Sequence, residues 1–248
     1  MINVRSKVVI VTGASSGIGA ALGQAFSREG ACVTLTARRL DRLREVARKC
    51  GNEVLIIPSD LTLGPDRKTI VEKTLERWGR IDILVNNAGI GMYGPFLSAS
   101  EADWRQIFEI NLFSLVFMTQ SVLPAMQTQG SGTVVNIASI GGLIAHSEKV
   151  TPYVASKHAV VGFSRGLARD LAGTGIRVLA VCPHLTATEF FAASPGAHEM
   201  APVVDQYKSF MDSPEEVAQG ILNQLGSQRV VVFPTAKPAR AYERQKDI

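Results

Sequence analysis

A tyrosine and a lysine four residues apart, in the stretch "YVASK", are the residue pair best suited to chemistry in this chain. On a helix, Tyr153 and Lys157 would share one face, with Cβ atoms about 5–6 Å apart. A free phenol has a pKa near ~10, and a neighbouring ammonium favours the phenolate and lowers that pKa. The pair therefore predicts a phenol that exchanges a proton with a substrate oxygen near working pH. Taken alone, such a pair is also common on ordinary surface helices.

The stretch "TGASSGIG", from Thr12 to Gly19, has the composition of a phosphate-binding loop. It follows a strand-like run and opens a helical one, which is the context that dinucleotide-binding motifs require. Glycines let the backbone approach a pyrophosphate, and the helix N-terminus offers free N–H groups. The alternative is a glycine-rich turn that binds nothing. The residues expected to contact a dinucleotide here are Gly13, Ser15, Ser16, Gly17, Ile18 and Gly19.

The end of the second strand-like run indicates which nicotinamide nucleotide is bound. An acidic residue there would bond the ribose hydroxyls and repel a 2′-phosphate. This chain instead has Arg38 and Arg39, whose guanidinium groups suit charge-assisted contact with phosphate. We therefore expect NADP(H) in preference to NAD(H). The alternative is that both arginines only begin a solvated helix.

Apolar runs and helical stretches alternate along the chain. The strand-like runs cover residues 7–13, 32–37, 53–60, 81–89, 132–139, 176–183 and 229–234. The helical stretches cover residues 17–30, 40–50, 65–79, 101–129, 153–173 and 213–226. This alternation predicts an α/β fold with one Rossmann-type, doubly wound, seven-stranded parallel sheet flanked by helices. We expect a single domain over residues 1–248, with the long connection 184–212 serving as a substrate loop.

Composition excludes several other classes of protein. The formal net charge of +4 is small, and no nucleic-acid-binding motif accompanies it. No uninterrupted apolar run reaches the ~18 residues of a membrane span, and the first residues lack a signal-peptide cleavage site. Cys32, Cys50 and Cys182 show no metal or disulfide spacing. We expect a cytoplasmic protein with no bound metal, no nucleic-acid partner and no membrane partner.

The motifs together resemble those of the short-chain dehydrogenases/reductases, in particular the compact single-domain branch. "TGASSGIG", "NNAG" (Asn86 to Gly89), Asn111, Ser139 and "YVASK" occur in that family's order and at about its spacing. The resemblance runs from residue 7 to about residue 190. One departure is His184, which follows Pro183 where the family often has glycine.

The resemblance implies roles for particular residues. Tyr153 would be the acid/base, Lys157 would also hold the nicotinamide ribose, and Asn111 would support a water beside the lysine. Ser139, at the end of a strand, would polarise the substrate carbonyl. Further cofactor contacts are expected from Asp60, Leu61, Asn87, Ala88, Gly89, Pro183 and Thr188, in addition to Tyr153 and Lys157.

These expectations combine into an NADP(H)-dependent oxidoreductase that interconverts a carbonyl and a secondary alcohol by hydride transfer. One alternative is a 3-oxoacyl-[acyl-carrier-protein] reductase, and another is a cofactor-binding regulator without turnover. Aromatic and aliphatic residues in three loops suggest a bulky apolar substrate, or else a lid over the cofactor. They are Met92, Tyr93, Phe96, Leu143, Ile144, Phe190, Phe191 and Tyr207. The helix segment Leu115 to Met118 is apolar all round, which favours a homodimer or homotetramer contact.

Overall fold

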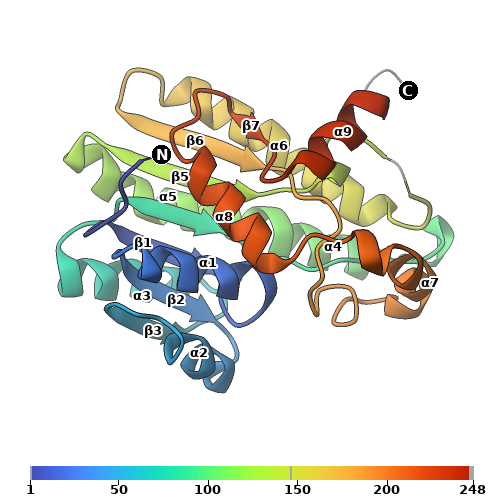
Figure 1. Ribbon diagram of the computed structural model, residues 1–248, viewed down its shortest axis with the longest axis horizontal. Coiled ribbons are helices and arrows are strands. Elements are labelled where there is room, and N and C mark those ends of the chain that lie inside the picture. Colours follow the sequence, from blue (N-terminus) through green and yellow to red (C-terminus); the bar gives the residue numbers. More distant parts are fainter. Residues whose placement is uncertain (1, 146, 246–248) are drawn as a thin grey trace.

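The computed structural model describes residues 2–145 and 147–245. Its centre is a parallel sheet with strand order β3-β2-β1-β4-β5-β6-β7 (Figure 1). The strands are β1 (Val8–Thr12), β2 (Cys32–Ala37), β3 (Val54–Pro58), β4 (Ile83–Asn86), β5 (Gly132–Ile137), β6 (Ile176–Val181) and β7 (Val231–Val232). The predicted seven-stranded, doubly wound sheet in a single domain is confirmed.

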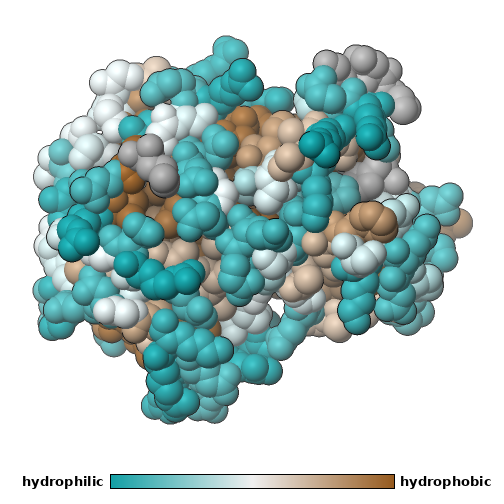
Figure 2. Space-filling model, viewed as in Figure 1, coloured by the Kyte–Doolittle hydropathy of each residue, from teal (hydrophilic) through white to brown (hydrophobic). Residues whose placement is uncertain are grey.

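Helices cover both faces of this sheet. They are α1 (Gly17–Arg28), α2 (Leu40–Ala47), α3 (Gly64–Trp78), α4 (Glu101–Phe108), α5 (Ser114–Gln129), α6 (Thr151–Asp170), α7 (Ala197–Tyr207), α8 (Pro214–Gln224) and α9 (Ala236–Gln245). Figure 1 shows α1 and α8 in front of the sheet, and the same view in Figure 2 shows mostly hydrophilic side chains on the outside of this layer.

The strand sequences explain the two layers, because successive side chains of a strand point to opposite faces. In β1, Val9 and Val11 join the core under α1 and α8, whereas Ile10 joins the core under α3 and α5. In β4, Val85 and Leu84 divide between the same two cores. A strand that must be apolar on both faces appears in the sequence as a continuous apolar run, which is why these strands could be predicted.

The strand order reverses between β1 and β4, since the chain moves outward to β2 and β3 and then returns to the other side of β1. At such a point the loops that leave the carboxyl ends of the two strands diverge and leave a crevice. The fold therefore positions the loops after β1 and β4 at the two walls of one cleft.

Three elements differ from the sequence-based predictions. The predicted helix 101–129 is interrupted by a π-helical turn, Glu109–Phe113, which separates α4 from α5. The long connection 184–212 contains α7, and the C-terminal segment, for which no helix was predicted, contains α9. In α9 the ring of Tyr242 packs 5.8 Å from that of Phe233, so this helix contacts the segment that follows β7.

Among the described residues, the helical stretch Glu101–Gln129 is long and apolar enough to cross a membrane by length and composition. Its α5 part packs Met118, Val122 and Met126 into the core beside the sheet. On its outer side, Phe113 and Phe117 are partly exposed and stack with ring centroids 6.3 Å apart. Core packing accounts for the inner apolar residues, and a subunit contact at the outer ones stays a prediction.

Asp82 ties the start of β4 to the start of β1. Its buried carboxylate accepts hydrogen bonds from Lys7 Nζ (3.0 Å), Val8 N (3.0 Å) and Arg80 Nε (2.8 Å). Burial alone raises the pKa of this carboxyl, but the donors from Arg80, Val8 and Lys7 outweigh it, and the net pKa is lowered. The ionised form of Asp82 is therefore stabilised by folding.

Replacing Asp82 with asparagine should lower the free energy of unfolding by roughly 2–3 kcal/mol at pH 7, because charge-assisted bonds are lost. A lowered carboxyl pKa contributes stability above the ordinary pKa and loses it as the pH falls through the folded value. Urea unfolding of both proteins should therefore show a difference that shrinks below about pH 4. Asp170→Asn, at the exposed end of α6, is the matched control. A pH-independent difference would contradict the proposed role of the charge.

Candidate functional site

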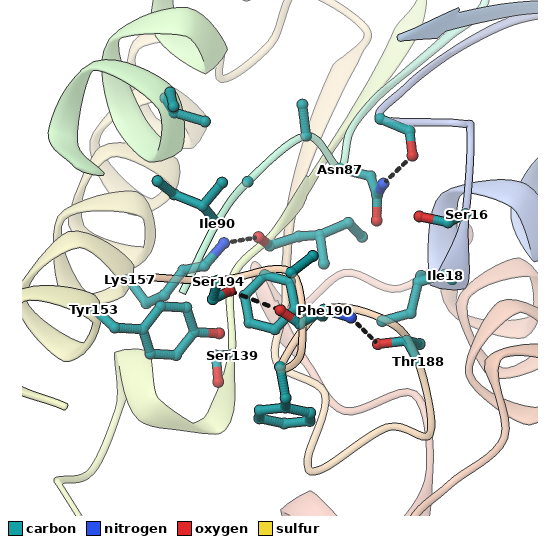
Figure 3. A pocket seen from close by; sticks show the side chains of 18 of the residues that line it. Ser16, Ile18, Asn87, Ile90, Ser139, Tyr153, Lys157, Thr188, Phe190 and Ser194 are labelled. Atoms are coloured by element: carbon teal, nitrogen blue, oxygen red, sulfur yellow. Dashed lines mark hydrogen bonds between the residues drawn. The ribbon is translucent and has the colours of Figure 1, made fainter. Parts of the chain in front are cut away.

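A cavity of about 690 Å³ lies at the carboxyl ends of the strands, where the sheet order reverses (Figure 3). It is lined by residues from the loops after β1, β2, β3, β4, β5 and β6 and from α6. Every residue proposed from the sequence for the cofactor or for catalysis lines this cavity, with two exceptions. Gly19 lies inside α1, and Asn111 lies behind the wall of the cavity in the π-helical turn.

The loop after β1 forms a cradle that side chains would fill. Gly13 and Gly17 have φ values of +63° and +54°, in the left-handed region that favours glycine. A Cβ on Gly13 would lie 2.8 Å from Ala88 Cα, and a Cβ on Gly19 would collide with the Gly13 carbonyl. The side chain of Ser16 does not cap α1, and the first turn of this helix contains no acidic residue. The cradle thus suits an anion such as a dinucleotide pyrophosphate.

The two walls of the cleft are joined by Thr12 and Asn87. Asn87 Nδ2 donates to the carbonyls of Thr12 (3.0 Å) and Gly13 (3.2 Å). Thr12 Oγ1 accepts from the backbone N–H groups of Asn87 (2.9 Å) and Ala88 (3.1 Å). These bonds fix the loop after β4 against the glycine cradle. Asn87 therefore holds these two loops in position relative to each other.

At the end of β2, Arg39 lies across the same cradle. Its guanidinium donates to Ser15 Oγ (3.1 Å) and Ser16 Oγ (3.0 Å), and it forms an ion pair of 3.6 Å with Glu189. Arg38 also lines the cavity, near Asp60 after β3. The pKa of Asp60 is lowered, first by the backbone N–H of Thr62 and to a smaller extent by the charge of Arg38, against the effect of burial. Two cations therefore stand at this end of the cleft.

At the opposite end, Tyr153 and Lys157 extend from α6 toward the end of β5. Figure 3 shows the Tyr153 hydroxyl beside that of Ser139, with Lys157 one turn further along α6. Lys157 Nζ lies 5.9 Å from the centre of the Tyr153 ring and donates to the Ile137 carbonyl at 2.9 Å. Ser139 Oγ accepts from Gly141 N at 3.0 Å, which fixes the hydroxyl at the strand end. The spacing in the sequence correctly placed these side chains together.

Asn111 supports the site from behind. Its side chain accepts from Ile90 N (2.8 Å), donates to Ile90 O (2.9 Å) and donates to Ser156 Oγ (3.0 Å). A Cβ on Gly89 would lie 3.1 Å from Asn111 Oδ1 and 3.5 Å from Lys157 Nζ, so both side chains border the same glycine. The π-helical turn is thus where α4–α5 is fastened both to the loop after β4 and to α6.

The acid–base properties of the pair differ from the expectation. Burial raises the pKa of Tyr153 to about 12, an effect that the Ser139 hydroxyl only partly offsets. Burial also lowers the pKa of Lys157 to about 8, because the charged amine is enclosed. The prediction that the ammonium lowers the phenol's pKa in this structure is wrong, because desolvation is the larger effect. At neutral pH the phenol is protonated and therefore able to donate.

Aromatic side chains cover the reactive end. The ring of Phe190 lies 5.8 Å from that of Tyr153, and the ring of Tyr93 lies 6.4 Å from it. Phe191 stacks on Tyr93 at 6.3 Å. Of the apolar residues suggested by the sequence, these three line the cavity, whereas Phe96 is exposed on the surface. The other four, Met92, Leu143, Ile144 and Tyr207, are not among the lining residues.

Sequence reasoning missed two residues of the cleft, one at each end. Ser194 Oγ accepts from Gly91 N (2.9 Å) and donates to Phe190 O, which holds the aromatic segment against the loop after β4. Glu189 reaches the arginines at the other end of the cleft. Neither residue belongs to a recognisable motif, and only the folded path of the segment after β6 reveals their contacts.

Comparison with known proteins gives consistent matches. A family model described as short chain dehydrogenase matches residues 7–198. An uncharacterised oxidoreductase of Staphylococcus saprophyticus is 38% identical over 192 residues, which are 76% of this chain and 82% of that protein. A 3-oxoacyl-[acyl-carrier-protein] reductase of Thermotoga maritima is 36% identical over 219 residues, which are 87% of this chain and 89% of that protein.

Solved structures superpose over nearly the whole chain. Levodione reductase has a TM-score of 0.87 at 29% identity and covers 96% of this chain and 99% of its own. A short-chain dehydrogenase/reductase from Burkholderia phymatum in complex with NAD has a TM-score of 0.87 at 25% identity, covering 98% and 94%. An actinorhodin polyketide ketoreductase variant with NADPH has a TM-score of 0.81 at 32% identity, covering 92% and 95%. Similar structures therefore hold either nicotinamide nucleotide.

Proposed function

Because the chain belongs to the short-chain dehydrogenase/reductase family of oxidoreductases, we propose that it interconverts a carbonyl and a secondary alcohol with NADP(H) as the cofactor. The observation that carries this proposal is a single cleft with a glycine cradle and two arginines at one end and the group of Ser139, Tyr153 and Lys157 at the other. The separation of a phosphate-binding end from a proton-donating end suits a dinucleotide whose reactive ring lies far from its phosphates.

The bound nucleotide would supply or accept the hydride, and the protein's own groups would handle the proton and the developing charge. Tyr153 is protonated at neutral pH because burial raises its pKa to about 12, so the hydroxyl can give its proton to an alkoxide oxygen. Ser139 Oγ, held by Gly141 N, would donate a hydrogen bond to the same oxygen. Lys157, fixed by the Ile137 carbonyl, provides positive charge at the back of the cleft.

Two arginines support the choice of NADP(H). Arg38 and Arg39 both line the cleft, on the side where β2 ends. Replacing Arg38 with aspartate removes a cation and adds a charge that repels a 2′-phosphate. We expect the ratio of the Michaelis constants for NADPH and NADH to rise by roughly ten- to a hundredfold, in favour of NADH.

The measurement is a pair of initial-rate titrations with the two nucleotides at saturating substrate. Arg44→Asp, at an exposed position on α2, makes the same charge change outside the cleft and should leave the ratio unaltered. A wild-type protein that uses NADH as well as NADPH would contradict the cofactor proposal. So would an Arg38→Asp variant with an unchanged ratio.

The aromatic cover over Tyr153 supports an apolar substrate moiety. Tyr93, Phe190 and Phe191 offer ring faces at the reactive end, and Val150, Val154 and Met200 line the same side. A screen of ketones and secondary alcohols for NADPH consumption or formation tests the activity. Acetoacetyl thioesters belong in the same screen, because similarity to a 3-oxoacyl-[acyl-carrier-protein] reductase favours that second candidate. Absence of turnover with intact nucleotide binding would instead support a regulator.

A further inference from the structure

The segment after β6 crosses the mouth of the cleft and contacts the cofactor end. We call residues 186–194 the strap. It begins at a β-bridge between Thr186 and Asp212, and Thr188 lies against the glycine cradle, within 3.0 Å of where a Cβ on Gly17 would stand. Figure 3 shows Thr188 next to Ile18, and Phe190 on the side of the cleft where Tyr153 lies. A movement of the strap would therefore change contacts at both ends of the cleft.

Glu189 fastens the strap to the arginine end of the cleft. Its carboxylate pairs with Arg39 Nη1 at 3.6 Å and with Arg42 Nη2 at 3.5 Å. Arg39 also donates to Ser15 and Ser16 of the cradle, so one guanidinium contacts both the strap and the nucleotide loop. Arg42 has a second carboxylate partner, Glu45, at 3.6 Å on α2. Glu189 thus connects two segments that are distant in sequence.

These ion pairs are weak enough for another anion to replace Glu189 at Arg39. The side chains of Arg39 and Glu189 are each 51% exposed, and pairs of this kind contribute little because water and salt screen them. A phosphate dianion carries more charge than a carboxylate and binds a guanidinium through two parallel hydrogen bonds. A phosphate placed beside Arg39 would therefore compete with Glu189, and the two anions would also repel each other.

We propose that Glu189 is a specificity-determining latch, whose carboxylate competes with the 2′-phosphate of the cofactor for Arg39. Binding of the phosphorylated nucleotide would release the strap from Arg39, whereas the nucleotide without the phosphate would leave the latch closed. A second cavity of about 580 Å³ is lined by residues 187–189 together with residues of the cradle, α1 and α2, so open space borders this part of the strap. This inference rests on the assignment of Arg39 to the phosphate end in the proposed function.

The test compares dissociation constants of NADPH and NADH, measured by nicotinamide fluorescence titration at low ionic strength. In Glu189→Gln, removal of the competing charge should tighten NADPH binding by roughly three- to tenfold and change NADH binding by less than about twofold. Glu45→Gln removes a similarly exposed carboxylate from the same Arg42 but leaves the pair of Glu189 with Arg39 in place, and should leave both constants nearly unchanged. Thermal melts of both variants confirm that they fold.

A second pair of variants identifies the group through which Glu189 acts. In an Arg39→Gln background, Glu189→Gln should no longer tighten NADPH binding, because the competition is for that guanidinium. The latch is overturned if Glu189→Gln affects both nucleotides equally, weakens NADPH, or behaves the same with and without Arg39. The wild-type ratio of the two constants tests the proposed cofactor separately. A wild type without NADPH preference would contradict that cofactor, even if Glu189→Gln gained affinity for NADPH alone.

Discussion

Replacing Tyr153 with phenylalanine is expected to lower kcat by roughly a hundred- to ten-thousandfold, the usual contribution of a positioned general acid. The variant keeps the ring that contacts Phe190 and Tyr93, so the aromatic packing at this end of the cleft is preserved. It removes the hydroxyl that lies beside Ser139 and that we propose as the proton donor. Initial rates with the best substrate of the screen give the comparison.

Binding of the nucleotide should persist in this variant. The glycine cradle, Asn87 and the arginines lie at the other end of the cleft, and none of the contacts described above for them involves the phenol. Tyr242→Phe removes the same atom from a tyrosine of α9 outside the cleft and should retain normal turnover. A Tyr153→Phe enzyme with near-normal kcat would exclude the phenol as the acid. Simultaneous loss of NADPH binding would indicate a structural role instead.

The fold and the position of the cleft could be predicted because they depend on local patterns. Continuous apolar runs predicted the buried strands, and the glycines of "TGASSGIG" predicted a cradle that other residues could not form. The spacing of Tyr153 and Lys157 predicted a shared helix face. Each of these patterns lies within one short segment, so it can be recognised without knowledge of any tertiary contact.

What the sequence could not show depends on contacts between distant segments. The π-helical turn has no glycine or proline to announce it, and its Asn111 is held by the backbone of Ile90 in another loop. The partner of Lys157 is a carbonyl of β5, which carries no residue-specific signal at all. The direction of the Tyr153 pKa shift was also not predicted. The spacing of residues indicates which side chains are neighbours, but it does not indicate how deeply the phenol is buried away from water.

Burying the charged amine of Lys157 destabilises the folded protein, so the role of this residue can be tested by measuring stability. Its side chain is only 4% exposed, and burial lowers its pKa from 10.5 to about 8. Below pH 8 the amine is protonated in both the folded and the unfolded chain, and the full cost of burying the charge is present. Between the folded and unfolded pKa values only the unfolded chain holds the proton, so the free energy of unfolding rises with pH. The shift corresponds to about 3 kcal/mol.

Replacing Lys157 with methionine should therefore have opposite effects on stability and activity. The difference in unfolding free energy, variant minus wild type, should fall by about 3 kcal/mol between pH 7 and pH 10.5, because only the wild type gains stability over that range. At pH 7 the variant keeps the volume of the side chain without its charge, yet turnover should drop by roughly a hundredfold or more. Urea unfolding across the pH range and initial rates at pH 7 provide the two measurements.

The matched control is Lys68→Met on α3, where the lysine side chain is 75% exposed. Its stability difference should stay flat over the same pH range. If the Lys157→Met difference were equally flat, the amine would not be desolvated in the folded protein. If the pH dependence appeared but turnover were unaffected, the amine would be buried at a cost in stability without contributing to catalysis, and the proposed role of its charge would be wrong. Joint loss of activity and gain of relative stability is the result that a cation kept for function requires.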